Sequence, residues 1–403
     1  MVSKTEIPAP RARHDFADLL IVSVAALTLA FAIVFLFVLQ ITNSGGGTRD
    51  FVVYWATGQQ LAHHANPYDA DAMLRMEDAA GFAVKGRTQL MRNPPWGLAV
   101  ALPLGFLGLR SAALVWSMAL IASLALSVRL IWRMNGSPAN FLHLIGLTFA
   151  PALLCLMMGQ TTLFAMLGFV LFLYLHRGNP FLAGASLWLC ALKPHLFLPI
   201  GVVLVVWILV TRSYRLIMGA VFALAASSLL ATIVFPAVWT DYALMFKSTG
   251  VAADQVPCLS VALRLWLRPE TLSLSYLPTA LSCVWGLAYF WRRRHAWDWM
   301  TEGSLLMLVS LLTAPYSWLF DNCVAMPALL QGAYQTTSRT LITILVFASV
   351  TVTVGFSAGV GNLSLFYLWT APAWLAWYLF ATNLKGTAPK STPIASPSFA
   401  EPL

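Results

Sequence analysis

Charged side chains are scarce in this sequence. Only 10% of its 403 residues are Asp, Glu, Lys or Arg, whereas 59% are hydrophobic, and the mean hydropathy is +0.76. A soluble globular protein needs about a quarter of its residues charged to cover its surface. The shortage therefore excludes a soluble globule. Apolar runs of about 20 residues recur along the chain and predict an all-α, polytopic integral membrane protein.

Acidic residues are fewer than basic ones, 15 against 24, which leaves a net charge of +9. Such an excess would suit a nucleic-acid-binding protein if it formed one surface. Here the Lys and Arg residues lie at the ends of apolar runs, as at Arg292-Arg293-Arg294. The positive-inside rule places such residues in cytoplasmic turns, so the charge indicates membrane orientation and predicts no nucleic-acid partner.

The five cysteines form no CxxC pair, and all but Cys258 lie in apolar runs. We expect them to behave as small hydrophobic residues, without a disulfide framework or a zinc site. The segments His63-His64 and Asp69-x-Asp71 also lack the spacing that would place metal ligands on one helix face. The sequence therefore predicts no metal and no other cofactor.

The N-terminus lacks an Ala-x-Ala cleavage site. Residues 1–18 are polar and are followed by an apolar run from about Leu19 to Ile41. This pattern predicts a cytoplasmic tail and an uncleaved first span. We expect the transmembrane domain to cover residues 19–381. The remaining residues 382–403 are rich in Pro, Ser and Thr and predict a disordered cytoplasmic tail.

Two polar segments interrupt the apolar runs, and we expect both to be external: a first loop at residues 43–93 and a second at residues 236–276. A short span from Pro94 to about Leu109 should follow the first loop. Two later runs are broken, at Lys193-Pro194-His195 and at Ala314-Pro315-Tyr316. We predict about 12 spans, or 11 or 13, because a run broken by proline forms one long helix or two short ones.

The first external loop carries an amphipathic pattern. Phe51, Tyr54, Trp55, Leu61 and Ala62 recur near helical spacing, with Gln59, Gln60 and His63 on the other face. This pattern predicts a helix over Phe51 to His64 that lies at the membrane interface, with Asp50 at its N-terminus. An acidic residue between an apolar span and an aromatic run is costly, so Asp50 is the first candidate for function.

Several short motifs together resemble glycosyltransferase family 87 of the GT-C superfamily, which is related to polyprenyl-phosphate-mannose-dependent mannosyltransferases. The resemblance covers about residues 15–380. The matching segments are, in chain order, Arg49-Asp50-Phe51-x-x-Tyr54-Trp55, Ala65-Asn66-Pro67-Tyr68, Asn93-Pro94-Pro95-Trp96, Gly159-Gln160-Thr161-Thr162, Ala183-Gly184 through Leu192-Lys193-Pro194-His195, Ser260-Val261-x-x-Arg264-Leu265, and Ala314-Pro315-Tyr316-Ser317-Trp318-Leu319-Phe320-Asp321.

The resemblance implies a GT-C fold, a multi-pass protein of the plasma or inner membrane, and an active site on the extracytoplasmic side. It also implies a polyprenyl-phosphate sugar donor that carries a hexose, mannose in the related enzymes. The acceptor would be a lipid or a glycan. The catalytic carboxylate would stand at the position of Asp50.

The chemistry of such a transfer can be stated independently. A polyprenyl phosphate is a good leaving group, so the enzyme must align the acceptor hydroxyl, remove its proton and neutralise the departing phosphate. Asp50 is the candidate base, although Asp also caps helices. Arg49, Arg92 and Lys193 are candidates for the donor phosphate, or are interface anchors. Candidates for substrate contact are Tyr54, Trp55, Tyr68, Gln160, His195 and Asp321.

Two other classes of protein remain open. A transporter or lipid flippase would also hold polar residues within the membrane, but in several helices near the midplane. A scaffold protein would not need an acidic residue at the start of an aromatic helix. The position of Asp50, Lys193 and Asp321 distinguishes these classes. An enzyme requires Asp50 in a cavity open to bilayer and external water, whereas a carrier requires a central site.

Overall fold

A computed structural model describes residues 49–82, 88–248, 256–360 and 365–383. These residues form helices and connecting turns, and no strand occurs among them. The fold is therefore all-helical, as expected. The predicted N-terminal tail, the first span Leu19 to Ile41 and residues 384–403 of the C-terminal tail lie outside the described residues.

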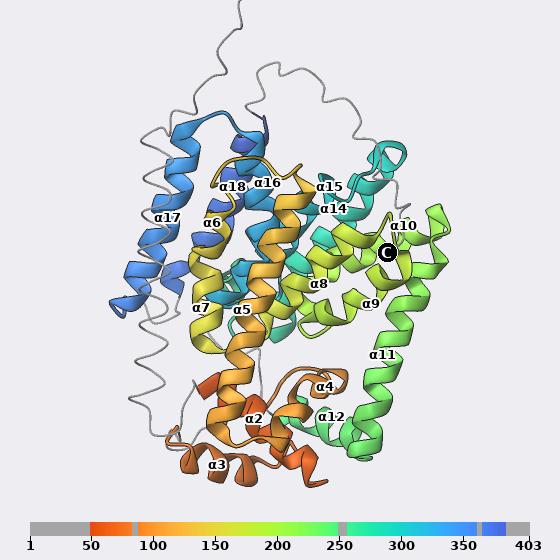
Figure 1. Ribbon diagram of the computed structural model, residues 1–403, viewed down its shortest axis with the longest axis vertical. Helices are drawn as coiled ribbons and strands as arrows, with labels where there is room; N and C mark the ends of the chain where they lie inside the picture. The colour runs from red at the N-terminus through yellow and green to blue at the C-terminus, as the bar shows by residue number, and fades with distance from the viewer. Residues whose placement is uncertain (1–48, 83–87, 249–255, 361–364, 384–403) are drawn as a thin grey trace, which may run out of the picture.

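The helices follow one another with short connections (Figure 1). In chain order they are α2 (Arg49–Ala62), α3 (Ala70–Ala79), η1 (Pro95–Gly97), α4 (Leu98–Ala101), η2 (Leu102–Phe106), α5 (Leu109–Met134), α6 (Leu144–Leu147), α7 (Ala150–Met158), α8 (Thr162–Leu175), α9 (Pro180–Cys190), η3 (Pro194–Leu196), α10 (Leu198–Thr211), α11 (Tyr214–Val234), α12 (Val238–Ser248), α13 (Leu259–Leu267), η5 (Leu272–Tyr276), α14 (Leu277–Arg293), η6 (Arg294–Ala296), α15 (Glu302–Leu312), η7 (Leu319–Ala325), α16 (Met326–Gln335), α17 (Arg339–Ser357), η8 (Leu365–Tyr367) and α18 (Thr370–Asn383).

Among the described residues, three helices, α5, α11 and α17, are long and apolar enough to cross a membrane by length and composition. A helix rises about 1.5 Å per residue, so about 20 residues are needed to cross the hydrocarbon core. Most other apolar helices are shorter, in part because prolines begin them, as Pro180 begins α9 and Pro199 lies in the first turn of α10. The structure supports a membrane protein, while the expected count of about 12 spans is not confirmed.

The segment expected as a short span from Pro94 to about Leu109 is helical from Pro95 to Phe106, and its crossing of the membrane stays a prediction. Pro95 to Phe106 is a helical segment that changes from 3-10 to α and back, and Leu107 and Gly108 then separate it from α5. The segment folds against α2. A Cβ on Gly105 would lie 2.0 Å from the carbonyl oxygen of Gly58, so the two backbones touch. The two glycines permit this close approach of the segment to α2.

The helix expected over Phe51 to His64 is present as α2, but it is more enclosed than an interface helix. Phe51, Val52 and Tyr54 are all buried. On one side Tyr54 stacks on Trp116 of α5, with ring centroids 5.0 Å apart. On the other side the expected polar face contacts protein, because the Gln59 side chain donates to the carbonyl of Gly105 at 2.9 Å. This helix is therefore part of the core.

Helices α9 and α11 also meet backbone to backbone. A Cβ on Gly184 would lie 1.9 Å from the carbonyl oxygen of Leu216, and one on Gly219 would lie 1.9 Å from that of Phe181. Small residues permit this close approach, which is the usual way that apolar helices associate in lipid. The contact fixes α9 and therefore the Lys193-Pro194 turn that follows it.

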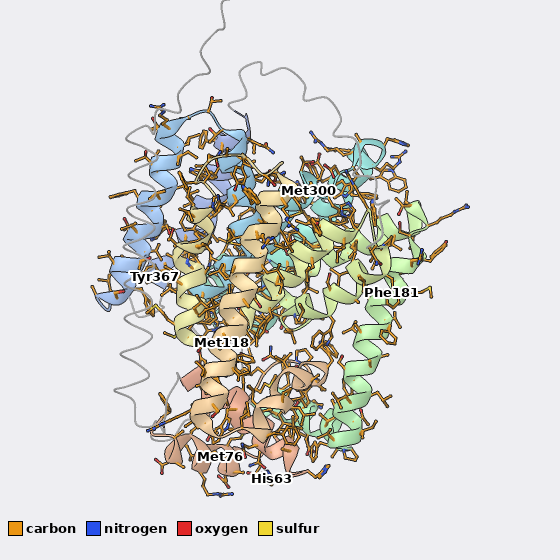
Figure 2. All side chains as sticks on the ribbon, viewed as in Figure 1. His63, Met76, Met118, Phe181, Met300 and Tyr367 are labelled. Carbon is orange, nitrogen blue, oxygen red and sulfur yellow. The ribbon has the colours of Figure 1, made fainter. Side chains whose placement is uncertain are left out.

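The two polar segments lie at the same end of the helix bundle. Figure 1 shows α2, α3, α4 and α12 together at the bottom, and Figure 2 places His63 and Met76 there and Met300 near the other end. The second segment was expected as a loop but contains α12, α13 and η5. Asn66 of the first segment donates to Asp241 of α12 at 2.9 Å. The prediction that both polar segments are external requires them to lie at the same end of the bundle. That this end is the external one stays a prediction.

Candidate active site

A cavity of about 570 Å³ lies where the polar segments meet the helix breaks. Its wall is formed by the start of α2, residues 88–94, the turn after α7, the break between α9 and α10, helix α12, and the break before η7. These stretches are far apart in the sequence. Apart from helix α12 and the loop at residues 88–94, these stretches are helix ends or helix breaks, where some backbone polar groups have no partner within the helix.

Asp50 faces this cavity from the first turn of α2 and is half-buried. The Gln160 side chain donates from Nε2 to Asp50 Oδ2 at 2.8 Å, and the Tyr54 hydroxyl donates to Gln160 Oε1 at 3.3 Å. Burial raises the pKa of Tyr54 to about 12, so this hydroxyl keeps its proton at neutral pH. The three side chains form a chain of hydrogen bonds that ends on a carboxylate.

Gln160 reaches Asp50 because α7 ends in a left-handed glycine. Gly159 has φ +72°, a conformation that residues with a Cβ rarely adopt, and it stops α7 after Met158. Its carbonyl accepts a hydrogen bond from the Trp116 indole at 2.8 Å. The turn is thereby held against α5, and Gln160 is directed at the start of α2.

Lys193 and Asp321 form a buried ion pair. Lys193 Nζ lies 2.6 Å from Asp321 Oδ1, and the two residues are 9% and 1% exposed. The Thr162 hydroxyl donates to the same oxygen at 2.6 Å, and the Trp318 backbone N–H donates to Oδ2 at 2.9 Å. The lysine also lies over the Phe320 ring, 4.9 Å from its centroid. Each charge compensates the other, which is how charges are accommodated inside a protein.

His195 lines the cavity and has a buried ring nitrogen without a hydrogen-bond partner among the described residues. Its ring stacks on Tyr316, with ring centroids 3.9 Å apart and an interplanar angle of 22°. Its Nε2 is buried and has no hydrogen-bond partner among the described residues, and the residue lines the cavity. A buried polar atom without a partner is uncommon, so His195 stays a candidate for substrate contact.

The structure brings together seven of the ten residues that the sequence proposed for the site. These are Asp50, Tyr54, Arg92, Gln160, Lys193, His195 and Asp321. Trp55 does not line the cavity, because its indole donates to the carbonyl of Leu107 at 3.0 Å. Tyr68 packs on Tyr242, with centroids 5.9 Å apart, so it supports the wall from behind. The side chain of Arg49 lies outside the described residues.

The sequence reasoning missed an aromatic wall. Tyr242 and Phe246 of α12 line the cavity together with Tyr276, Tyr316 and Trp318. Tyr242 and Phe246 are four residues apart and therefore share one face of α12. The sequence analysis interpreted this segment only as a polar loop. The four-residue spacing of the two aromatic residues could have predicted that they share a helix face. Among the described residues no group of three or more His, Cys, Asp and Glu side chains is placed to hold a metal ion.

Comparison with known proteins gives one match. The model of glycosyltransferase family 87 matches residues 92–320, which is more than half of the chain. The matched stretch includes the Gly159-Gln160 turn and the Lys193-Pro194 break, but it begins after Asp50 and ends one residue before Asp321. No curated protein and no solved structure shows a significant match. The resemblance inferred from the motifs is thereby confirmed at the level of the family.

Proposed function

Because the chain belongs to glycosyltransferase family 87, we propose that it transfers a hexose, mannose in the first instance, from a polyprenyl-phosphate donor to a hydroxyl of a lipid or glycan acceptor. The protein is a membrane glycosyltransferase by its family and its apolar helices. The donor, the acceptor, the GT-C fold and the extracytoplasmic position of the site in the plasma or inner membrane belong to the proposal.

One observation carries this proposal: Asp50 lines a 570 Å³ cavity and is held there by Gln160 at 2.8 Å. A general base must be oriented and must reach the space that the acceptor occupies. Asp50 lies inside the first turn of α2 and not at the capping position before it. The positive end of the helix dipole still favours its negative charge. This position suits a base better than a simple helix cap.

The reaction would proceed by a single displacement. Asp50 takes the proton of the acceptor hydroxyl, whose oxygen attacks the anomeric carbon while the bond to the phosphate oxygen breaks. One base without a covalent intermediate inverts the anomeric configuration, by analogy with inverting glycosidases. The aromatic wall offers flat, apolar faces on which a sugar ring can pack.

The departing phosphate requires positive charge. Arg92 lines the cavity and is exposed, so it can meet a phosphate at the mouth. Lys193 also lines it, but its charge is already balanced by Asp321. A phosphate near Lys193 would share the lysine with that carboxylate, so Lys193 contributes orientation as well as charge. Asp321 then serves to hold Lys193, which differs from the direct substrate contact expected from the sequence.

A transporter or flippase is the alternative that the sequence left open. Asp50, Lys193 and Asp321 share one cavity, which is bordered by both polar segments at one end of the bundle. A carrier needs a central site reached alternately from both sides. The arrangement and the family both favour the enzyme.

The test is a transfer assay with purified protein and a panel of polyprenyl-phosphate sugars, including mannose, with a membrane lipid extract as acceptor. We expect one sugar to be transferred, and NMR of the product should show an anomeric configuration opposite to that of the donor. Retention of configuration would contradict the single-displacement mechanism. Transfer only from a nucleotide sugar would contradict the polyprenyl donor.

A further inference from the structure

Arg264 is a buried cation with no ion-pair partner among the described residues. It belongs to α13 and is 1% exposed. No described residue accepts a hydrogen bond from its Nε or Nη1, and it forms no ion pair within the described part of the chain. The other buried charged residues there all have partners: Lys193 pairs with Asp321, Glu302 with Arg293, and Glu77 accepts from the Gln89 backbone.

Burying a charge raises the free energy of the folded protein. An arginine cannot avoid this by losing its proton, because the guanidinium group stays charged in proteins. Burial without an acceptor or a counter-ion is strongly unfavourable. A guanidinium group donates along two edges, one formed by Nε and Nη2 and the other by Nη1 and Nη2, and each edge has one of the two unpartnered donors of Arg264. Either edge can bind two oxygens of a phosphate or carboxylate. The ligand-free side chain is therefore complementary to an anion.

The surroundings place this arginine beside the active-site wall. Helix α13 contacts η5 and α14. A small apolar cluster formed by Val256, Cys258 and Val261 packs against Tyr316 and Trp318, which line the cavity. The next element, η5, ends at Tyr276, which also lines it.

A second unsatisfied donor lies on η5. Ser275 is 3% exposed, and its hydroxyl has no hydrogen-bond partner among the described residues. Two buried polar side chains without partners on touching elements are difficult to explain as packing, because each alone is unfavourable.

We propose that α13 and η5 form an anion subsite behind the Tyr316 and Trp318 wall, in which Arg264 binds the phosphate group of a lipid-linked substrate. The identity of the anion as a lipid phosphate rests on the proposed function, whereas the need for an anion follows from Arg264 itself. A free phosphate ion has the same chemistry, so the experiment distinguishes the two sources.

The test measures thermal unfolding of the purified full-length protein in detergent with three additives: a polyprenyl monophosphate, the corresponding neutral polyprenol, and inorganic phosphate. We expect the polyprenyl monophosphate to raise the Tm and the polyprenol to have no effect. A comparable rise with inorganic phosphate would identify free phosphate as the ligand and would overturn the lipid source. Equal rises with monophosphate and polyprenol, or no rise with any additive, would overturn the anion subsite.

Variants of Arg264 test whether the rise in Tm with polyprenyl monophosphate depends on this residue. Arg264→Met should weaken the binding of polyprenyl monophosphate at least about tenfold, because a charge-assisted hydrogen-bonded pair is lost. The Tm of the ligand-free variant should be unchanged or higher, since an unpaired buried charge is removed. Arg268→Met is the matched control, because Arg268 is exposed one turn further on, and it should keep wild-type binding.

A lower ligand-free Tm with unchanged monophosphate binding would make Arg264 a structural residue and overturn the proposal. If Arg264→Met does not fold, Arg264→Lys replaces it, and wild-type affinity in that variant would also overturn the proposal because the guanidinium fork is absent. None of these measurements requires sugar transfer. Failure of the anion subsite is therefore distinct from failure of the proposed enzymatic function, which the transfer assay tests separately.

Discussion

Gln160 and Asp50 are separated by 110 residues in the chain and joined by a hydrogen bond of 2.8 Å. The bond connects the turn after α7 to the first turn of α2 and holds the carboxylate at the cavity. Both residues line the cavity, so the bond fixes the position of the Asp50 carboxylate in its wall. The site thus contains one oriented anion, one compensated ion pair and an aromatic wall.

Asp50→Asn should reduce turnover by about 10²- to 10⁴-fold, because an amide cannot take the proton of the acceptor hydroxyl. The size of the side chain is kept, so expression, membrane insertion and Tm should match the wild type. Asp71→Asn is the matched control, since Asp71 is exposed on α3 and does not line the cavity. Near wild-type turnover in Asp50→Asn, measured with the true donor at equal protein level, would remove the base from the mechanism.

Gln160→Leu should lower kcat by about tenfold or more with little change in the KM for the donor. The variant removes a hydrogen bond to a charged group that orients the base, and such bonds contribute roughly 1.5–3 kcal/mol. The combined variant Asp50→Asn/Gln160→Leu tests whether Gln160 acts through Asp50. Its turnover should be close to that of Asp50→Asn alone. Multiplied losses would instead show that Gln160 contacts the substrate independently.

Lys193→Met should destabilise the protein by about 3–5 kcal/mol, because it leaves the carboxylate of Asp321 buried without its counter-ion. The second change in Lys193→Met/Asp321→Leu should restore much of that loss, since both charges are then gone. Chemical denaturation in detergent measures the three free energies of unfolding. Equal stability of Lys193→Met and the wild type would mean that the ion pair contributes nothing to the fold.

Gly184→Ala should destabilise the packing of α9 on α11 by about 1–3 kcal/mol, because the added methyl group meets the backbone of Leu216 at 1.9 Å. Gly201→Ala is the control, since a Cβ at this position of α10 meets nothing within 4 Å. That control should be neutral or slightly stabilising, because alanine favours the helix. Thermal unfolding distinguishes the two, and an equal response would show that α9 and α11 can separate without cost.

The orientation prediction can be tested by cysteine labelling in intact cells. Asp71→Cys lies on exposed α3 beside the cavity end, and Arg292→Cys lies on the exposed end of α14. We expect an impermeant maleimide to label the first and not the second. The parent protein controls for its five native thiols, of which four are buried and one is half-buried. Labelling of Arg292→Cys alone would reverse the membrane orientation and place the cavity in the cytoplasm.

Features that depend only on residues close together in the sequence were predictable from it. The breaks at Lys193-Pro194 and Ala314-Pro315 appear as helix ends, because proline lacks the N–H that a helix interior requires. The helix that begins near Asp50 was also predicted within two residues at each end. The exposure of that helix was not, because Phe51 and Tyr54 look the same in sequence whether they face lipid, headgroups or protein.

The sequence by itself determined that this chain is an all-helical membrane protein of its family. It also indicated where the helices break and which polar residues are energetically unfavourable in their apolar surroundings. Hydropathy and proline chemistry act locally, so they are visible in any short stretch. Only the tertiary structure decided that Lys193 pairs with Asp321 and that Gln160 holds Asp50. It also decided that Nε and Nη1 of Arg264 find no acceptor among the described residues. These relationships depend on which helix ends meet in space, and that is set by close backbone contacts such as Gly184 against Leu216, which no local pattern encodes.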